Sequence, residues 1–327
     1  MEDRRFDERE FVQEVVSHTN VEPHYTFPNS SGLLQDLSDL IYYQEEPFGS
    51  TSIYAQYCVM RKAKEVGIKV LLDGQGADEL FARYHGYYFA FLTNLLKLGR
   101  LRDFMSEIVR ISKITGLSIF YILLHVNRET FRALPYSLRT LLYTKVKEGL
   151  KYVRKDFFHT FKDREKTWID DRKWGDLNHR LLADITRYSL RGLLKYEDRN
   201  SMAFSIETRV PFADDHRLIE FVSHCPFTYK IHNGWTKYLL RCATEDILPP
   251  KVRWRRDKKG FVTSENLWLY EIREELKKLI FSRRCDYIND EALYRDFDFI
   301  LESHRDKEGV SKIWRVINLK LWLQRFF

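Results

Sequence analysis

Apolar residues recur at helical spacing over most of the chain, and one short segment near residue 70 interrupts this rhythm. The spacing predicts helices over three early segments, residues 7–17, 33–43 and 54–66. Residues 68–72, Ile-Lys-Val-Leu-Leu, form an apolar run typical of a buried strand. Residues 24–27 predict a further short strand. From Ala77 onward, helical spacing returns and dominates to the C-terminus.

This order of elements indicates an α/β fold with a parallel sheet, because helices and strands alternate over the first part of the chain. We therefore divide the chain into a partial α/β part, residues 1–95, and a mainly helical part, residues 96–327. Gly and Pro are sparse, at 14 and 8 residues, which favours long helices with few tight turns.

The composition is that of a globular chain. Of its 327 residues, 44% are apolar and 31% are charged, which excludes bulk disorder and fibrous repeats. The four cysteines lie far apart and indicate neither a disulfide framework nor a zinc site. The charged N-terminus does not resemble a signal peptide, and the longest apolar run, residues 117–126, is too short to cross a bilayer. We expect a cytoplasmic protein whose net charge of +7 suits anionic ligands without demanding nucleic acid.

Residues 68–84 predict a strand, a loop with two glycines and a helix. In open α/β sheets, ligands bind at the carboxyl ends of strands. Gly74 and Gly76 would let the backbone approach a phosphate closely, and Asp78 or Glu79 could hold Mg²⁺ against that phosphate. The alternative is a plain turn followed by two acidic residues that the helix dipole favours. The glycine spacing lacks the dinucleotide fingerprint, so a Rossmann NAD site is not expected.

Residues 194–214 embed several polar groups among apolar residues, so these groups must be paired. They are Glu197, Asp198, Arg199, Asn200, Glu207, Arg209 and Asp214. They form either an ion-pair network that braces the fold or the polar wall of a ligand pocket.

A basic run follows a helix predicted from Gly234 to about Ile247. Its six cations are Lys251, Arg253, Arg255, Arg256, Lys258 and Lys259. The run is a solvated loop, a phosphate site that neutralises a pyrophosphate leaving group, or a nucleic-acid surface with Trp254 and Phe261 as stacking platforms. At the C-terminus, residues 311–327 carry a helical apolar stripe that fits a docked core helix better than a membrane-surface helix.

Four segments, in this order, resemble the synthetase domain of glutamine-dependent asparagine synthetases. EEPFGSTS, residues 45–52, resembles the loop before the helix that leads to the nucleotide strand. GIKVLLDGQGADELFARYHGY, residues 67–87, resembles the family's second nucleotide-loop motif, SGEGSDE followed by FGGY. EDRNSMAFSIETRVPFAD, residues 197–214, resembles DRxxM…xExRVPFLD. GWTKYLLRCATEDILPPKVRWRRDKKGF, residues 234–261, resembles GxxKxxLR…LPxxVxxRxKxGF, so the resemblance covers nearly the whole chain.

The resemblance implies a truncated parallel sheet of the adenine-nucleotide alpha-hydrolase type, the PP-loop ATPase fold, with ATP and Mg²⁺ as cofactors. The carboxylate of aspartate, or of a related substrate, attacks the α-phosphate of ATP, and pyrophosphate leaves an acyl-adenylate. Ammonia, which a glutaminase domain releases from glutamine, then displaces AMP to give the amide. The resemblance implies no nucleic-acid or membrane partner and leaves a homodimer open.

The motif match assigns the glycine loop to the nucleotide. It implies that Asp73, Gly74 and Gly76 lie at the ATP and that Asp78 is a Mg²⁺ ligand. Gln75 stands where the better-known enzymes carry Glu. Because an amide cannot act as a general base, we expect Gln75 to hydrogen-bond a substrate amine or the incoming ammonia.

The match assigns the later segments to phosphate binding and to the pocket frame. It implies that Lys237 contacts the phosphates and stabilises charge in the transition state, while Arg255 and Lys259 help to hold pyrophosphate. Glu207 and Arg209 receive a structural role at the pocket.

Some features depart from the family pattern. Thr51 falls near a position where those enzymes carry an Arg that could hold a substrate carboxylate, and Arg83 replaces a glycine. With Gln75, Thr51 keeps a sugar acid or a peptide open as the carboxylate substrate. No segment matches the Ser-Gly-Gly-x-Asp-Ser pyrophosphate loop or the Cys-initiated glutaminase domain. We therefore expect a fragment with an open sheet edge that binds ATP poorly and is inactive alone. The remaining alternatives are a basic nucleic-acid-binding protein and an inactive remnant that acts as a partner surface.

Overall fold

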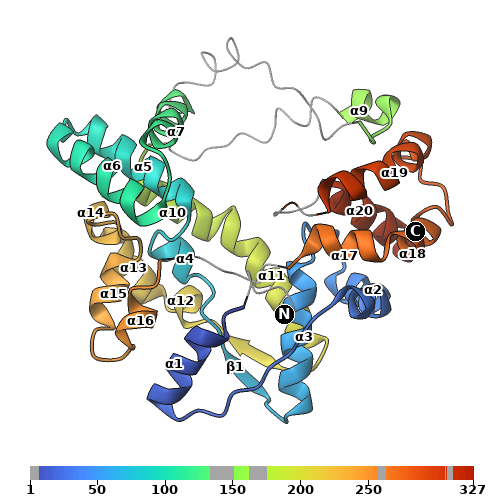
Figure 1. Cartoon of the computed structure of the whole chain (residues 1–327), viewed down its shortest axis with the longest axis horizontal. Coiled ribbons are helices and arrows are strands. Elements are labelled where there is room, and N and C mark those ends of the chain that lie inside the picture. Colours follow the sequence, from blue (N-terminus) through green and yellow to red (C-terminus); the bar gives the residue numbers. More distant parts are fainter. Residues whose placement is uncertain (1–6, 133–150, 162–174, 257–262, 306, 308–311) are drawn as a thin grey trace.

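The computed structural model describes residues 7–132, 151–161, 175–256, 263–305, 307 and 312–327 (Figure 1). The first elements are α1 (Arg9–Thr19), α2 (Ser30–Gln44), α3 (Ser52–Glu65), β1 (Val70–Leu72), α4 (Ala77–Leu80) and α5 (His85–Lys97). Next come α6 (Leu101–Thr115), α7 (Ile119–Arg132), α9 (Lys155–Phe161), α10 (Leu177–Thr186), α11 (Ser189–Met202) and β2 (Glu207–Arg209). The last elements are α12 (Pro211–Asp214), α13 (His216–His224), α14 (Phe227–Lys230), α15 (Tyr238–Ala243), α16 (Pro250–Arg253), α17 (Glu265–Glu271), α18 (Arg273–Ile280), α19 (Asp290–His304) and α20 (Lys312–Phe326).

A small parallel sheet joins the two predicted parts of the chain. β1 pairs with β2 in the register Val70 to Glu207 and Leu72 to Arg209. A further hydrogen bond continues the ladder, because the Asp73 amide donates to the carbonyl of Arg209 at 2.9 Å. The parallel α/β arrangement predicted from the sequence is confirmed in this coarse form. The pairing places the loop after β1 beside the turn after β2.

Two local predictions about strands were wrong, and one strand was missed. Residues 24–27 form no strand, because no described segment pairs with them. β1 is not buried, since Val70 is 43% exposed and Leu72 is 77% exposed. In the described part of the chain, β2 is the single partner of β1, and the exposure of these side chains shows that the sheet face that carries them is uncovered. β2 itself was not predicted, because three residues of the polar sequence Glu-Thr-Arg carry no apolar alternation.

Two hydrophobic clusters flank this sheet. One joins α2 and α3 to the C-terminal helices, and its largest buried side chains include Trp314 and Phe297. The other joins α5, α6, α7 and α10 around Tyr87 and Phe91. Figure 1 shows α11 running between the two groups of helices, where it packs on both α3 and α10. Helix α11 thus links the two clusters.

The C-terminal segment is a docked helix, as its apolar stripe predicts. Ile313, Trp314, Ile317 and Leu321 of α20 all lie in the first cluster. Among the described helices, none is both long enough and apolar enough to span a bilayer.

α19 offers a matched test of the first cluster. Phe297 is fully buried, whereas Phe299, on the opposite side of the same helix, is 73% exposed. We expect Phe297→Ala to lower the free energy of unfolding by about 3–5 kcal/mol, because it removes a large apolar side chain and leaves a cavity. Phe299→Ala should change it by less than about 0.5 kcal/mol. Urea unfolding followed by circular dichroism measures both, and equal losses would contradict this assignment of the core.

Candidate active site

Two of the predicted site residues, far apart in the sequence, meet in the structure. Asp78 lies on α4, directly after the glycine loop, and Lys237 precedes α15. The Lys237 Nζ lies 2.5 Å from the Asp78 Oδ1, and both side chains are partly buried. The backbone reinforces the contact, because the Lys237 amide donates to the carbonyl of Phe81 at 3.0 Å. The loop after β1 and the segment before α15 therefore form one unit.

This ion pair borders a pocket of about 300 Å³ that is rich in cations. Its polar lining comprises one carboxylate and several cations, namely Asp78, Lys237, Arg83, Arg241, Arg253 and Arg255. Such an excess of positive charge in a partly enclosed pocket favours an anionic ligand.

Arg241 is the buried member of this cation group. Its Nε donates to the carbonyl of Thr236 at 2.8 Å, and its two Nη atoms donate to the carbonyls of Arg253 and Arg255. The guanidinium lies beside a pair of touching indole rings, 5.1 Å from the Trp235 centroid and 5.7 Å from that of Trp254. Burial, together with the charge of Arg83, lowers the pKa of Arg241 to about 10, which leaves it charged at neutral pH. Arg241 thus ties the basic segment to the chain before Lys237.

The predicted helix over residues 234–247 was wrong at its start. His232 and Trp235 bridge in antiparallel fashion, and the two residues between them turn with φ of 51° at Asn233 and 77° at Gly234. Asn-Gly with both residues left-handed is a tight hairpin turn. Lys237 is also left-handed, with φ of 53°, and α15 begins only after it.

The described part of the basic run is not a freely solvated loop. The ammonium of Lys251 lies 2.7 Å from Glu10 and 3.0 Å from Glu14, both on α1. The guanidinium of Arg255 lies 2.7 Å from Glu8, beside the same helix. Helix α1 therefore neutralises part of the run. Lys258, Lys259 and Phe261 lie outside the described residues.

Of the two acidic residues at the start of α4, one faces the pocket and one faces the core. Asp78 contacts Lys237, as described above. Glu79 is fully buried, and its Oε1 accepts hydrogen bonds from the hydroxyls of Tyr84 and Ser189, both at 2.8 Å. Glu79 is therefore a structural residue that anchors α4 to α11.

The glycine loop is held by its own backbone and by α12. The Asp73 carboxylate accepts a hydrogen bond from the backbone amide of Gln75 at 3.0 Å. Burial raises the pKa of Asp73. Gly76 has φ of 90°, and a Cβ there would lie 3.1 Å from that of Ala213. A side chain at position 76 is thus opposed both by conformation and by space. No atom of the described residues lies within 4 Å of a Cβ placed on Gly74, whose assignment to the nucleotide stays a prediction.

Three further residues that the motif match placed near the site have other surroundings. Glu207 and Arg209 are both exposed and pair with each other at 2.7 Å, as a surface ion pair that adds little stability. Thr51 is fully buried: its amide donates to Glu265 at 2.6 Å, and its hydroxyl lies 2.6 Å from that of Thr263. The side chain of Thr51 therefore faces the protein interior.

Glu197, one of the polar groups of residues 194–214, received no role of its own from the sequence. It lies on α11, is almost completely buried, and neither carboxylate oxygen accepts a well-formed hydrogen bond from the described residues. Burial and the charge of Asp73 raise the pKa of Glu197 to about 7, and the side chains of Gln75 and Thr208 offset this only in part. A buried carboxyl group of α11 therefore lies beside the side-chain amide of Gln75.

Comparison with known proteins identifies the family of this chain. The sequence profile of the asparagine synthase family matches residues 1–324. The chain belongs to the asparagine synthase family. It is 28% identical to asparagine synthetase [glutamine-hydrolyzing] 1 of Bacillus subtilis, over 98% of this chain and 50% of that protein. It is also 28% identical to a putative asparagine synthetase [glutamine-hydrolyzing] of Mycobacterium bovis, over 88% of this chain and 44% of that protein.

A more distant relative is the amidase chry2 of Gibberella zeae, at 22% identity over 80% of this chain and 42% of that protein. The chain spans about half the length of the curated relatives that it matches. The family that the four motifs indicate is therefore confirmed, while the roles of individual residues stay predictions.

The raised pKa of Glu197 predicts a pH-dependent cost to folding. In the unfolded chain this carboxyl ionises near its ordinary pKa, so above pH 5 the folded chain must either keep the proton or bury a charge. We expect Glu197→Gln to match the wild type in stability near pH 4 and to exceed it increasingly up to pH 8, by roughly 1.4 kcal/mol per unit of pKa difference. Urea unfolding across this pH range, with Glu207→Gln as the exposed control, measures the gain. A gain that is constant with pH would contradict a raised pKa.

Proposed function

We propose that this chain supplies the ATP-dependent half of a glutamine-dependent amide ligase of the asparagine synthetase type. The carboxylate oxygen of aspartate, or of a related acid, attacks the α-phosphorus of ATP, and the bond to the β-phosphate breaks. Ammonia then attacks the acyl carbon of the adenylate, loses a proton, and AMP leaves with the former carboxylate oxygen. The observation that carries this proposal is the Lys237–Asp78 pair inside a pocket lined by cations.

In this proposal, Lys237 and the arginines of the pocket hold the phosphates. The β- and γ-phosphates leave the α-phosphorus together as pyrophosphate. Negative charge accumulates on this leaving group, and nearby cations stabilise it. Lys237 points into the pocket, and Arg255 reaches it from the basic run. Lys259 is expected to join them. Asp73, Gly74 and Gly76 are the proposed contacts for the rest of ATP.

Asp78 is the residue that would hold Mg²⁺. Among the described residues, no group of three or more His, Cys, Asp or Glu side chains gathers as a resident metal site. Mg²⁺ commonly arrives with a nucleotide and uses one or two protein carboxylates, phosphate oxygens and water. A single carboxylate beside a cationic pocket fits that kind of site. The ion supplies charge neutralisation to the phosphates when it is bound.

In this proposal, Gln75 and Glu197 together replace the glutamate that better-known relatives carry where this chain has Gln75. The amide of Gln75 can hydrogen-bond ammonia or a substrate amine but cannot remove its proton. Glu197 lies buried next to it with a pKa of about 7. This pairing, with the inward-facing Thr51, favours a non-aspartate carboxylate, such as a sugar acid or a peptide, as the second candidate substrate.

A nucleic-acid surface on the basic run is the less favoured alternative. Lys251 and Arg255 are paired with acidic residues at helix α1. Trp254 is covered by the guanidinium groups of Arg241 and Arg253 at 5.7 and 5.2 Å, so its ring is not an open stacking platform.

Binding of magnesium pyrophosphate tests the proposed site directly. We expect Lys237→Met to weaken the affinity at least about tenfold, because the substitution removes the ammonium that faces the pocket. The control Lys62→Met removes an exposed lysine on α3 that pairs with Glu65 and should leave the affinity unchanged. Isothermal titration calorimetry provides the measurement. Equal affinities in the wild type and Lys237→Met would overturn the proposal.

We expect the chain by itself to bind magnesium ATP more weakly than the micromolar range. Its sequence contains no Ser-Gly-Gly-x-Asp-Ser loop, whose backbone amides would share the phosphates, and Asp78 offers one carboxylate to the metal. Titration with ATP and Mg²⁺ provides the check, with pyrophosphate as the reference ligand. Micromolar affinity for ATP would contradict this expectation.

A further inference from the structure

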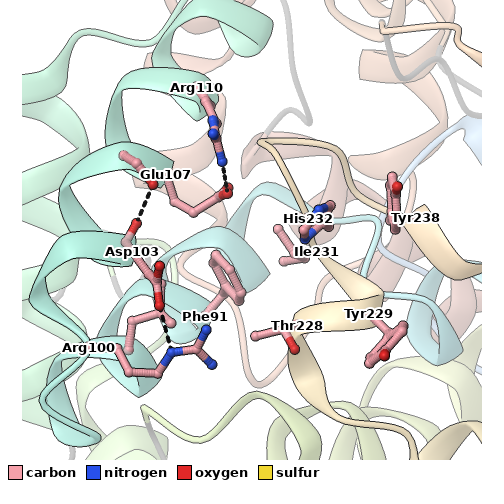
Figure 2. Close-up of a pocket in the computed structure, with 12 residues that line it drawn as sticks. Phe91, Arg100, Asp103, Glu107, Arg110, Thr228, Tyr229, Ile231, His232 and Tyr238 are labelled. Carbon is pink, nitrogen blue, oxygen red and sulfur yellow. Dashed lines mark hydrogen bonds and ion pairs between the residues drawn. The ribbon is translucent and has the colours of Figure 1, made fainter.

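A second hollow lies against the hairpin that leads to Lys237. It has a volume of about 430 Å³ and separates α6 from residues 228–238 (Figure 2). Helix α6 contributes Arg100, Asp103, Glu107 and Arg110 to its wall. None of the four sequence motifs includes α6. The contacts across this hollow nevertheless reach the motif that carries Lys237.

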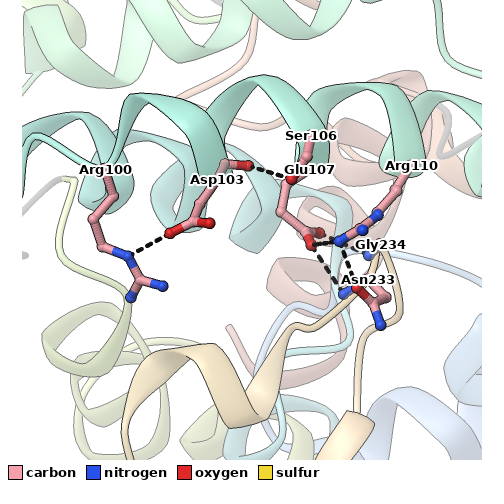
Figure 3. Close-up of polar contacts among 7 residues, drawn as sticks. All are labelled: Arg100, Asp103, Ser106, Glu107, Arg110, Asn233 and Gly234. Carbon is pink, nitrogen blue, oxygen red and sulfur yellow. Dashed lines mark hydrogen bonds and ion pairs between the residues drawn. The ribbon is translucent and has the colours of Figure 1, made fainter.

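Glu107 crosses the gap and binds the hairpin turn with both of its oxygens. Its Oε1 accepts a hydrogen bond from the Asn233 amide at 3.0 Å, and its Oε2 accepts one from the Gly234 amide at 2.7 Å (Figure 3). These are two consecutive backbone donors of a left-handed turn, an arrangement that binds anions. Arg110 supports the carboxylate at 3.0 Å and also binds the Asn233 side chain. The carboxylate of Glu107 is thus the anion that this turn binds.

The turn is also fixed from its other sides. The Tyr88 hydroxyl, from α5, donates to the carbonyl of Gly234 at 2.8 Å. A Cβ on Gly234 would lie 2.9 Å from the Arg110 carbonyl carbon and 2.9 Å from the Ile114 side chain. Helix α6 therefore touches the turn closely as well as binding it. These hydrogen bonds and the close contact with α6 together fix the position of the hairpin.

Two residues connect this turn to Lys237, and both are held. Trp235 is bridged to His232 by two backbone hydrogen bonds, at 2.9 and 3.0 Å. Thr236 is buried, and its carbonyl accepts the hydrogen bond from Arg241. The Lys237 amide then donates to Phe81. These hydrogen bonds fix the Lys237 backbone relative to the turn.

We propose that Glu107 is a positioning residue for Lys237: it fixes the Asn233-Gly234 turn and thereby holds the Lys237 ammonium at Asp78 in the cation pocket. The value of this position for catalysis rests on the proposed function. The mechanical link between Glu107 and Lys237 does not rest on it. A carboxylate is needed at position 107 because it alone offers two acceptors to the two amides and a charge to Arg110.

The test compares Glu107→Ala and Glu107→Gln with Asp103→Asn. Asp103 lies one turn away on the same helix, lines the same hollow, and pairs with Arg100. Hydrogen exchange of the Asn233 and Gly234 amides reports the turn, and acetylation of Lys237, quantified by mass spectrometry, reports the exposure of its amine. We expect both rates to rise about tenfold in Glu107→Ala, as loss of charge-assisted hydrogen bonds allows, and to rise less in Glu107→Gln. Asp103→Asn should match the wild type.

Gly234→Ala provides an independent variant that leaves Glu107 unchanged. The added methyl group must displace α6 or the turn, so Lys237 acetylation should rise as in Glu107→Ala. Unfolding curves first establish that each variant is folded, and Glu107→Gln serves if Glu107→Ala is not. Faster amide exchange with unchanged Lys237 acetylation would reduce Glu107 to a purely structural residue and overturn the inference, as would unchanged exchange.

Magnesium pyrophosphate binding separates this inference from the proposed function. If both hold, Glu107→Ala weakens pyrophosphate binding whereas Asp103→Asn does not. If the wild type fails to bind pyrophosphate, the proposed function is wrong, but the acetylation of Lys237 still decides whether Glu107 positions it.

Discussion

The contact between Lys237 and Asp78 is the interaction on which the pocket depends. It joins the start of α4 to the segment before α15, more than a hundred and fifty residues later. The two opposite charges meet in a pocket where cations outnumber carboxylates. Each arginine there has its own restraint, through carbonyl groups, aromatic rings or the acidic residues at α1. These restraints let like charges stand close together while the pocket keeps its attraction for anions.

The sequence was informative where function depends on short motifs and less so where it depends on burial. The glycine loop and the helices on either side of it could be anticipated from residue order, and the motif resemblance placed Asp78 and Lys237 at one site. The hairpin before Lys237 was mistaken for a helix, although Asn233-Gly234 is a recognisable turn signal. The apolar residues that follow it carry helical spacing, and that signal was extended too far towards the N-terminus.

Other features carried no sequence signal of their own. Glu197 and Glu207 occur in one polar segment, yet helix α11 buries the first and β2 exposes the second. Glu107 lies in an amphipathic helix where a charged residue usually faces solvent. Its contact with the hairpin depends on how α6 packs against a segment over a hundred residues away. Such contacts follow from tertiary structure, which local periodicity does not encode.

The closeness of Arg241 to the neighbouring rings of Trp235 and Trp254 has a spectroscopic consequence. Indole emission depends on the surroundings of the ring, and here those surroundings include a guanidinium group that lines the cation pocket. An anion that draws the guanidinium groups away from the rings would change the intensity or the wavelength of the emitted light. Intrinsic tryptophan emission, to which five other tryptophans also contribute, therefore offers a label-free signal of rearrangement around Arg241.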